Sequence, residues 1–171
     1  MPVIERYRDL FEHEKDCNDK MLAMIKSVRE SNREDSRFQR AVSLAGHICA
    51  CRENWLDRMH AVGIGQVDWY DDKCELETLR ARFTAMEVHW SSYLAKLTDE
   101  DLNEEFEFPT RDGSRYRWHI EGQIKQLVGH AAYHRGQIAL LVDDLGGETV
   151  DTDYLYWVIA RNPRFGKIGP G

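Results

Sequence analysis

The sequence has no uninterrupted apolar run of the length that a membrane-spanning helix needs, which is about 20 residues. The segment Met1–Tyr7 enters a charged amphipathic pattern directly, without the apolar stretch of a secretion signal. We therefore expect a protein that has no membrane partner and that is cytoplasmic.

The chain is also short of positive charge. It holds 23 Lys and Arg against 30 Asp and Glu, which gives a net charge of −7 with His neutral. Nucleic-acid binders usually carry a basic face, so we expect no nucleic-acid partner. Cysteine is scarce, at four residues in 171, and a chain of this length can bury a core without disulfides. Cys49 and Cys51 are two positions apart on an expected helix, which points them to different sides and favours reduced, buried thiols.

What the sequence has in abundance is helical periodicity. Apolar residues recur every three or four positions in four long segments, and such stripes can be buried only against one another. The sequence therefore predicts an all-α protein, a four-helix bundle. Residues 1–160 would form this domain and residues 161–171 a C-terminal tail. The four segments run from Val3 to Val28, from about Phe38 to about His60, from Leu76 to Leu97, and from about Ile120 to about Leu145.

Between the third and fourth segments the apolar period changes to two. The alternating runs Glu105–Phe108 and Arg115–Trp118 flank Asp112-Gly113, a typical hairpin turn, so a short β-hairpin should precede the last long helix. Gly146-Gly147 should end that helix, because glycine adopts the left-handed cap conformation easily.

The histidines are the candidate functional residues. The chain has seven, and His130 and His134 are four positions apart, so both imidazoles project from one helix face and can share a metal ion. His134 lies within the apolar stripe of its helix, and His47 lies at the inner edge of another stripe. Three neutral imidazoles around a divalent cation leave a coordination position open, which is typical of a catalytic site rather than a structural one.

These motifs lead to a family resemblance. The segments Leu44–Ile48, His130–Ile138 and Leu145–Gly147, together with Asn18, resemble the DinB (YfiT-like) family over nearly the whole chain. The resemblance implies a four-helix bundle in an unusual helix order, a divalent metal ion on His47, His130 and His134, and a homodimer. Characterised members of that family include transferases and isomerases that use low-molecular-weight thiols.

The residues leave the reaction open. A metal ion with an open position can stabilise a bound thiolate as nucleophile, which fits a thiol S-transferase acting on a small molecule such as a low-molecular-weight thiol. It can equally produce a metal-bound hydroxide for hydrolysis. A third alternative is a metal- or ligand-binding stress protein without catalysis. Imidazole ligands suit Zn, Ni and Fe, so the sequence does not select the ion.

Three acidic or amide residues are candidates to support the site. Glu14 and Asn18 interrupt the apolar stripe of the first segment, which predicts that they line the site and are the weak candidates for a catalytic or orienting role. The alternative is that both are tolerated near the solvent edge of the helix. Glu53 is a further candidate, as a partner that orients His47.

Overall fold

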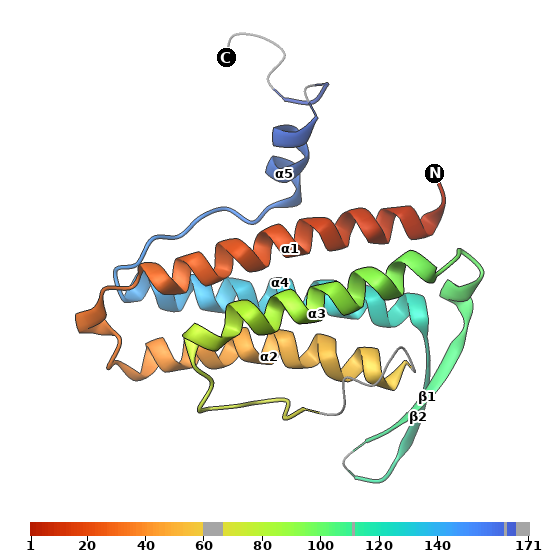
Figure 1. Cartoon of the computed structure of the whole chain (residues 1–171), viewed down its shortest axis with the longest axis horizontal. Helices are drawn as coiled ribbons and strands as arrows, with labels where there is room; N and C mark the ends of the chain where they lie inside the picture. The colour runs from red at the N-terminus through yellow and green to blue at the C-terminus, as the bar shows by residue number, and fades with distance from the viewer. Residues whose placement is uncertain (60–66, 111, 163, 167–171) are drawn as a thin grey trace.

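The computed structural model describes residues 1–59, 67–110, 112–162 and 164–166, and within them the chain is mainly helical (Figure 1). The long helices begin and end close to the predicted positions, although α2 ends at Arg58 and the predicted end, His60, lies outside the described residues. The elements are α1 (Val3–Ser27), α2 (Ser36–Arg58), α3 (Leu76–Lys96), β1 (Glu105–Pro109), β2 (Arg115–His119), α4 (Ile120–Asp144) and α5 (Tyr154–Arg161).

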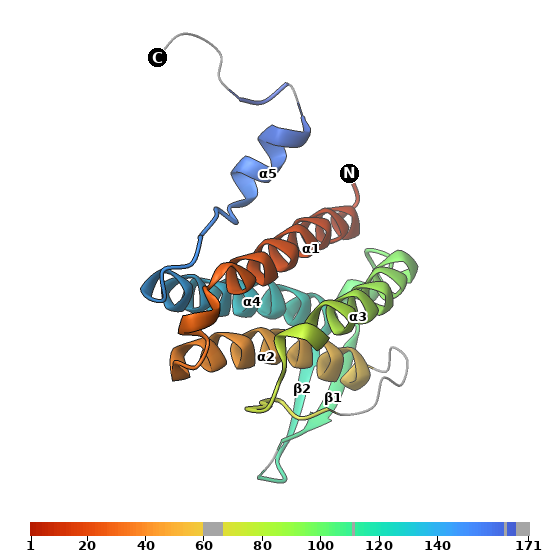
Figure 2. The ribbon, with the colours of Figure 1, turned by 60° about the vertical axis from the view of Figure 1, so that its left-hand side comes forward.

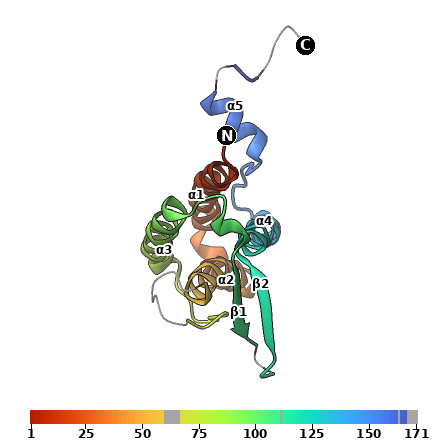
Figure 3. The ribbon, with the colours of Figure 1, turned by 90° about the vertical axis from the view of Figure 1, so that its right-hand side faces the viewer.

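The four long helices form a bundle, as the sequence predicted. Seen from the end, α3 and α4 occupy opposite corners, and α1 and α2 each pack against both of them (Figure 3). Helices α2 and α3 run in the same direction, so residues 67–75 return along the bundle before α3 begins (Figure 1). This crossover differs from a simple up-and-down bundle and carries a loop past the middle of α2.

Large apolar side chains from all four long helices fill the bundle interior. Trp90 of α3 is fully buried, and its indole nitrogen donates a hydrogen bond to the carbonyl oxygen of Arg52 at 2.9 Å. Each large apolar side chain removed from water in this way stabilises the fold by about 1.5–3 kcal/mol. Other fully buried members of this core are Met21, Ile25, Leu44, Ile48, Leu79, Phe83, Met86, Leu127 and Ile138.

The ends of α2 and α4 are fixed by local contacts. The Asp35 carboxylate accepts a hydrogen bond from the Arg37 amide at 2.9 Å, and His119 Nδ1 accepts one from the Gly122 amide at 3.1 Å. Each side chain pairs an amide that the helix itself leaves free. After α4, Gly146 adopts the predicted left-handed conformation, with φ of 69°.

The predicted hairpin is present as an antiparallel pair. Phe106 of β1 lies opposite Trp118 of β2, and Phe106 is buried against Trp55 of α2. The hairpin thus covers one end of α2. None of the helices in the described ranges is both long and apolar enough to cross a membrane.

The short helix α5 extends away from the bundle (Figure 2). It is held to α1 by Trp157, whose ring packs edge-on against His13 at a centroid distance of 5.6 Å. Residues 163 and 167–171 of the expected tail lie outside the described residues, so the division into a domain and a tail stays a prediction.

Candidate metal centre

Two helices that pack against each other carry the three candidate ligands. His47 lies in the middle of α2, and His130 and His134 lie one turn apart on α4. Because residues four apart on a helix share a face, both α4 imidazoles point toward α2. The structure therefore brings together all three histidines that the sequence singled out.

The three imidazoles converge on one small volume. One nitrogen from each residue can be chosen so that all three lie within 4.8 Å of one another. The Nε2 atoms of His47 and His130 are 3.2 Å apart, and His134 lies with its ring centroid 4.9 Å from that of His47. His47 and His134 are buried, while His130 is half-buried. This is the arrangement that a three-histidine metal centre needs.

The outer nitrogens of two of these rings have fixed partners. His47 Nδ1 lies 2.6 Å from the carbonyl oxygen of Trp69, and His134 Nδ1 lies 2.7 Å from Oε1 of Gln137. Both partners are acceptors, so each Nδ1 carries the proton and each Nε2 keeps its lone pair. A ring that donates through one nitrogen in this way is oriented for a metal ion at the other.

The environment also keeps the imidazoles of His47 and His130 neutral. Burial lowers the pKa of His47, and burial together with the charges of His134, His47 and Arg52 lowers the pKa of His130 to about 4. Both rings are therefore uncharged at neutral pH, and only the uncharged ring can bind a metal ion.

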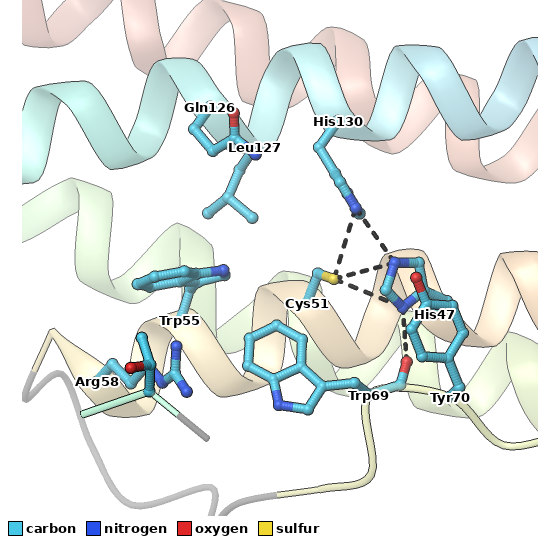
Figure 4. Close-up of a pocket in the computed structure, with 10 residues that line it drawn as sticks. His47, Cys51, Trp55, Arg58, Trp69, Tyr70, Gln126, Leu127 and His130 are labelled. Carbon is cyan, nitrogen blue, oxygen red and sulfur yellow. Dashed lines mark hydrogen bonds between the residues drawn. The ribbon is translucent and has the colours of Figure 1, made fainter. Parts of the chain in front are cut away.

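A pocket of about 420 Å³ opens beside the cluster (Figure 4). Its far wall is aromatic, and the Arg58 guanidinium lies 4.8 Å from the ring centroid of Trp55 and 4.9 Å from that of Trp69. None of the described acidic side chains forms an ion pair with Arg58, so its charge is available to an anionic group in the pocket. The lining residues are His47, Cys51, Trp55, Arg58, Trp69, Tyr70, Thr110, Gln126, Leu127 and His130.

The polar residues predicted on α1 make their contacts within the bundle. The buried Glu14 carboxylate forms an ion pair with Arg52, which is also buried. Asn18 donates a hydrogen bond to Glu87 at 3.0 Å. Neither Glu14 nor Asn18 is among the described residues that line the pocket, and a role for them at the site stays a prediction.

The predicted partner of His47 is replaced by another group. Glu53 accepts hydrogen bonds from Arg82 on α3, at 3.1 Å from the Arg82 Nε atom, and it is the Trp69 carbonyl that contacts His47. Residues 47 and 53 are six positions apart on one helix, so their side chains point to different sides. The orientation of His47 therefore depends on the crossover loop rather than on α2.

Sequence reasoning missed three further residues at the site: Cys51, Gln137 and Trp69. Cys51 follows His47 by one turn of α2, and Gln137 follows His134 by three positions on α4. The spacing of Cys51 from His47 and of Gln137 from His134 could have predicted that each lies beside a candidate ligand, because residues three or four apart on a helix are neighbours. Trp69 gave no such signal, since a backbone carbonyl in a loop has no sequence signature.

The fold and the cluster define a four-helix-bundle protein with a candidate three-histidine metal centre. The sequence model of the DinB family matches residues 2–162, and the chain belongs to this family. This match confirms the resemblance drawn from the motifs. No curated protein and no solved structure matches the chain significantly.

Proposed function

We propose that the protein binds one divalent metal ion through His47, His130 and His134 and acts on a small molecule in the adjoining pocket. The observation that carries this proposal is the convergence of three imidazoles beside a pocket of about 420 Å³. A site that served only to hold the fold together would have no need of such a space next to its ligands.

The donor atoms present fit a divalent ion. Around a tetrahedral ion with bonds of about 2.0–2.1 Å, two ligand nitrogens lie about 3.3–3.4 Å apart. The 3.2 Å between the Nε2 atoms of His47 and His130 is close to that value. An ion bound there would supply a Lewis acid that lowers the pKa of a bound thiol or water. The imidazole ligands suit Zn, Ni and Fe.

Thiol transfer is the reaction class that the pocket favours. Hydrolysis usually requires a general base within reach of the attacking water, and the described residues of the pocket include no carboxylate. A bound thiol needs no such base once its proton has left. The Arg58 guanidinium at the aromatic wall would bind the carboxylate of a small thiol, and the aromatic rings would bind the apolar part of its reaction partner. A homodimer and a cytoplasmic location stay predictions of the family resemblance and the sequence.

The metal content of purified variants tests the site. We expect about one divalent ion per chain in the wild type, and a loss of at least about 100-fold in affinity for each of His47→Ala, His130→Ala and His134→Ala. His89→Ala, at an exposed histidine on α3, is the matched control and should bind like the wild type. Equal metal content in all four variants would show that these histidines are not the ligands.

Substrate profiling tests the reaction class. With the metal-loaded protein, turnover of a panel of small electrophiles should require an added thiol. Turnover at the same rate without thiol would instead support hydrolysis, and metal binding without any turnover would support a binding protein.

A further inference from the structure

Cys51 places a sulfur atom beside the three histidines. It follows His47 by one turn of α2, so both side chains point toward α4. The Cys51 Sγ atom lies 3.5 Å from Nε2 of His47 and 3.8 Å from Nε2 of His130 (Figure 4). With 4% of its surface exposed, Cys51 forms part of the wall between the cluster and the pocket.

The other cysteines are buried away from the candidate ligands, although the Cys17 sulfur lies 3.2 Å from Nε2 of His13, which is not one of them. The Cys17 thiol donates to the Thr152 carbonyl at 3.4 Å, and the Cys49 thiol lies 3.8 Å from a Glu53 carboxylate oxygen. Cys74 packs against Gly46, where an added Cβ would lie 2.9 Å from its sulfur. Of the four cysteines, Cys51 alone has its sulfur within 4 Å of two candidate ligand nitrogens.

These distances match those between ligands of one ion. Around a tetrahedral ion with metal–sulfur bonds of about 2.3 Å and metal–nitrogen bonds of about 2.0–2.1 Å, sulfur and nitrogen lie about 3.5–3.8 Å apart for ordinary bond angles. The distances from Cys51 Sγ to the two Nε2 atoms, 3.5 and 3.8 Å, fall within this range. The Sγ atom also lies 3.7 Å from Nδ1 of His47, so it is beside the imidazole ring, and the Cys51 side chain has to turn toward the Nε2 atoms to join the three imidazoles.

We propose that Cys51 is a fourth protein ligand, which makes the centre a His3Cys site in the resting protein; this inference rests on the metal binding proposed above. On binding, the Cys51 S–H bond breaks, the proton passes to solvent, and the sulfur lone pair forms the bond to the ion. Because Cys51 lies on the pocket side, an incoming thiol must displace it or enter as a fifth ligand. The softer donor set also favours zinc and cobalt over magnesium and manganese.

Cobalt(II) absorption spectroscopy of the full chain tests this assignment directly. The metal-free wild type titrated with cobalt(II) should develop a thiolate-to-cobalt charge-transfer band in the near ultraviolet that saturates at one equivalent. Cys51→Ser should still bind one cobalt ion, without that band and with an affinity at least about tenfold lower. Cys49→Ser, two positions away on the same helix, is the matched control and should keep both the band and the affinity.

The outcomes separate the two proposals. One bound cobalt without the band in the wild type, or an unchanged band in Cys51→Ser, would overturn the role of Cys51 and leave the three-histidine site intact. No cobalt binding by the wild type would overturn both proposals. Cys51→Ala provides a second variant that adds no polar atom to the interior, and the circular dichroism of each metal-free variant shows that it is folded.

Discussion

The bundle contains two buried polar clusters that differ in how their polar groups are paired. In the first, Glu14 and Arg52 form an ion pair between α1 and α2. The Arg52 guanidinium lies between aromatic rings, 5.4 Å from the Phe11 centroid and 4.6 Å from that of Trp90. Both charges therefore find their partners inside the protein.

The second cluster, His47, His130 and His134, is arranged in the opposite way. The outer nitrogens of His47 and His134 are held by Trp69 and Gln137, while one nitrogen of each of the three rings lies within 4.8 Å of the others. Lone pairs that face each other are unfavourable unless a proton or a cation lies between them. A buried polar residue is therefore not by itself evidence of a ligand site. Imidazole nitrogens whose lone pairs converge, with no hydrogen-bond donor between them, are such evidence.

The variant with the largest expected effect on stability removes the ion pair of the first cluster. Glu14→Gln leaves the Arg52 charge buried without a counterion, and the free energy of unfolding of the metal-free protein should fall by about 3–5 kcal/mol. Urea denaturation followed by circular dichroism measures this change. If the loss were below about 1 kcal/mol, the Glu14–Arg52 pair would not be a structural element of the bundle.

A surface pair on the same helix provides the control for that variant. Glu12 and Lys15 form an ion pair with half-exposed side chains. Because solvent screens such a pair, Glu12→Gln should change the free energy of unfolding by at most about 0.5 kcal/mol.

The second prediction concerns the group that orients His134. Gln137→Ala removes the acceptor at Nδ1, so the metal affinity should fall about 10–100-fold with little change in the stability of the metal-free protein. Gln137→Glu retains an acceptor and should keep or raise the affinity, because a carboxylate makes the imidazole more basic. Competition titration with a zinc chelator measures the metal affinity of both variants. Equal affinities for the two would show that Gln137 does not orient His134 for metal binding.

The smallest effect is a pH dependence of stability. The pKa of His130 is lowered from 6.5 to about 4 in the folded protein, mainly by burial. The unfolded chain therefore binds the extra proton first, and the stabilising contribution is complete above pH 6.5 and is lost as the pH falls toward 4. For this half-exposed ring we expect a loss of about 1 kcal/mol after allowance for solvent screening.

Comparing the metal-free wild type with metal-free His130→Ala isolates the contribution of His130 to the pH dependence of stability. The free energy of unfolding of His130→Ala should decline less steeply than that of the wild type between pH 6.5 and 4. Parallel declines would mean that His130 takes up its proton equally readily in the folded and unfolded states.

Much of the fold and part of the site could be predicted from the sequence. The apolar stripes predicted the four long helices, and the Asp112-Gly113 turn between alternating runs predicted the hairpin. Helical spacing put His130 and His134 on one face, and the apolar stripe around His134 pointed that face inward. Local periodicity is sufficient for such predictions, because a helix fixes which residues share a side.

Local periodicity could not predict the partners of the buried polar residues. Glu14 and Asn18 were identified as polar residues in an apolar stripe and are buried, whereas Glu53 was predicted as the partner of His47 and pairs with Arg82 instead. The partners of these three residues, Arg52, Glu87 and Arg82, lie between 29 and 69 positions away. A periodic pattern shows that a polar group faces the core, but it does not show which group from another helix meets it.

By itself the sequence determined the helices, their buried faces and the two α4 histidines, because each depends on contacts within one segment. Only the tertiary structure decided that α2 packs against α4, that His47 and Cys51 therefore meet His130, and that the loop after α2 brings the Trp69 carbonyl to His47. The physical reason is that the centre is made of atoms from three segments, and their distances depend on how the helices pack and on the route of the crossover loop.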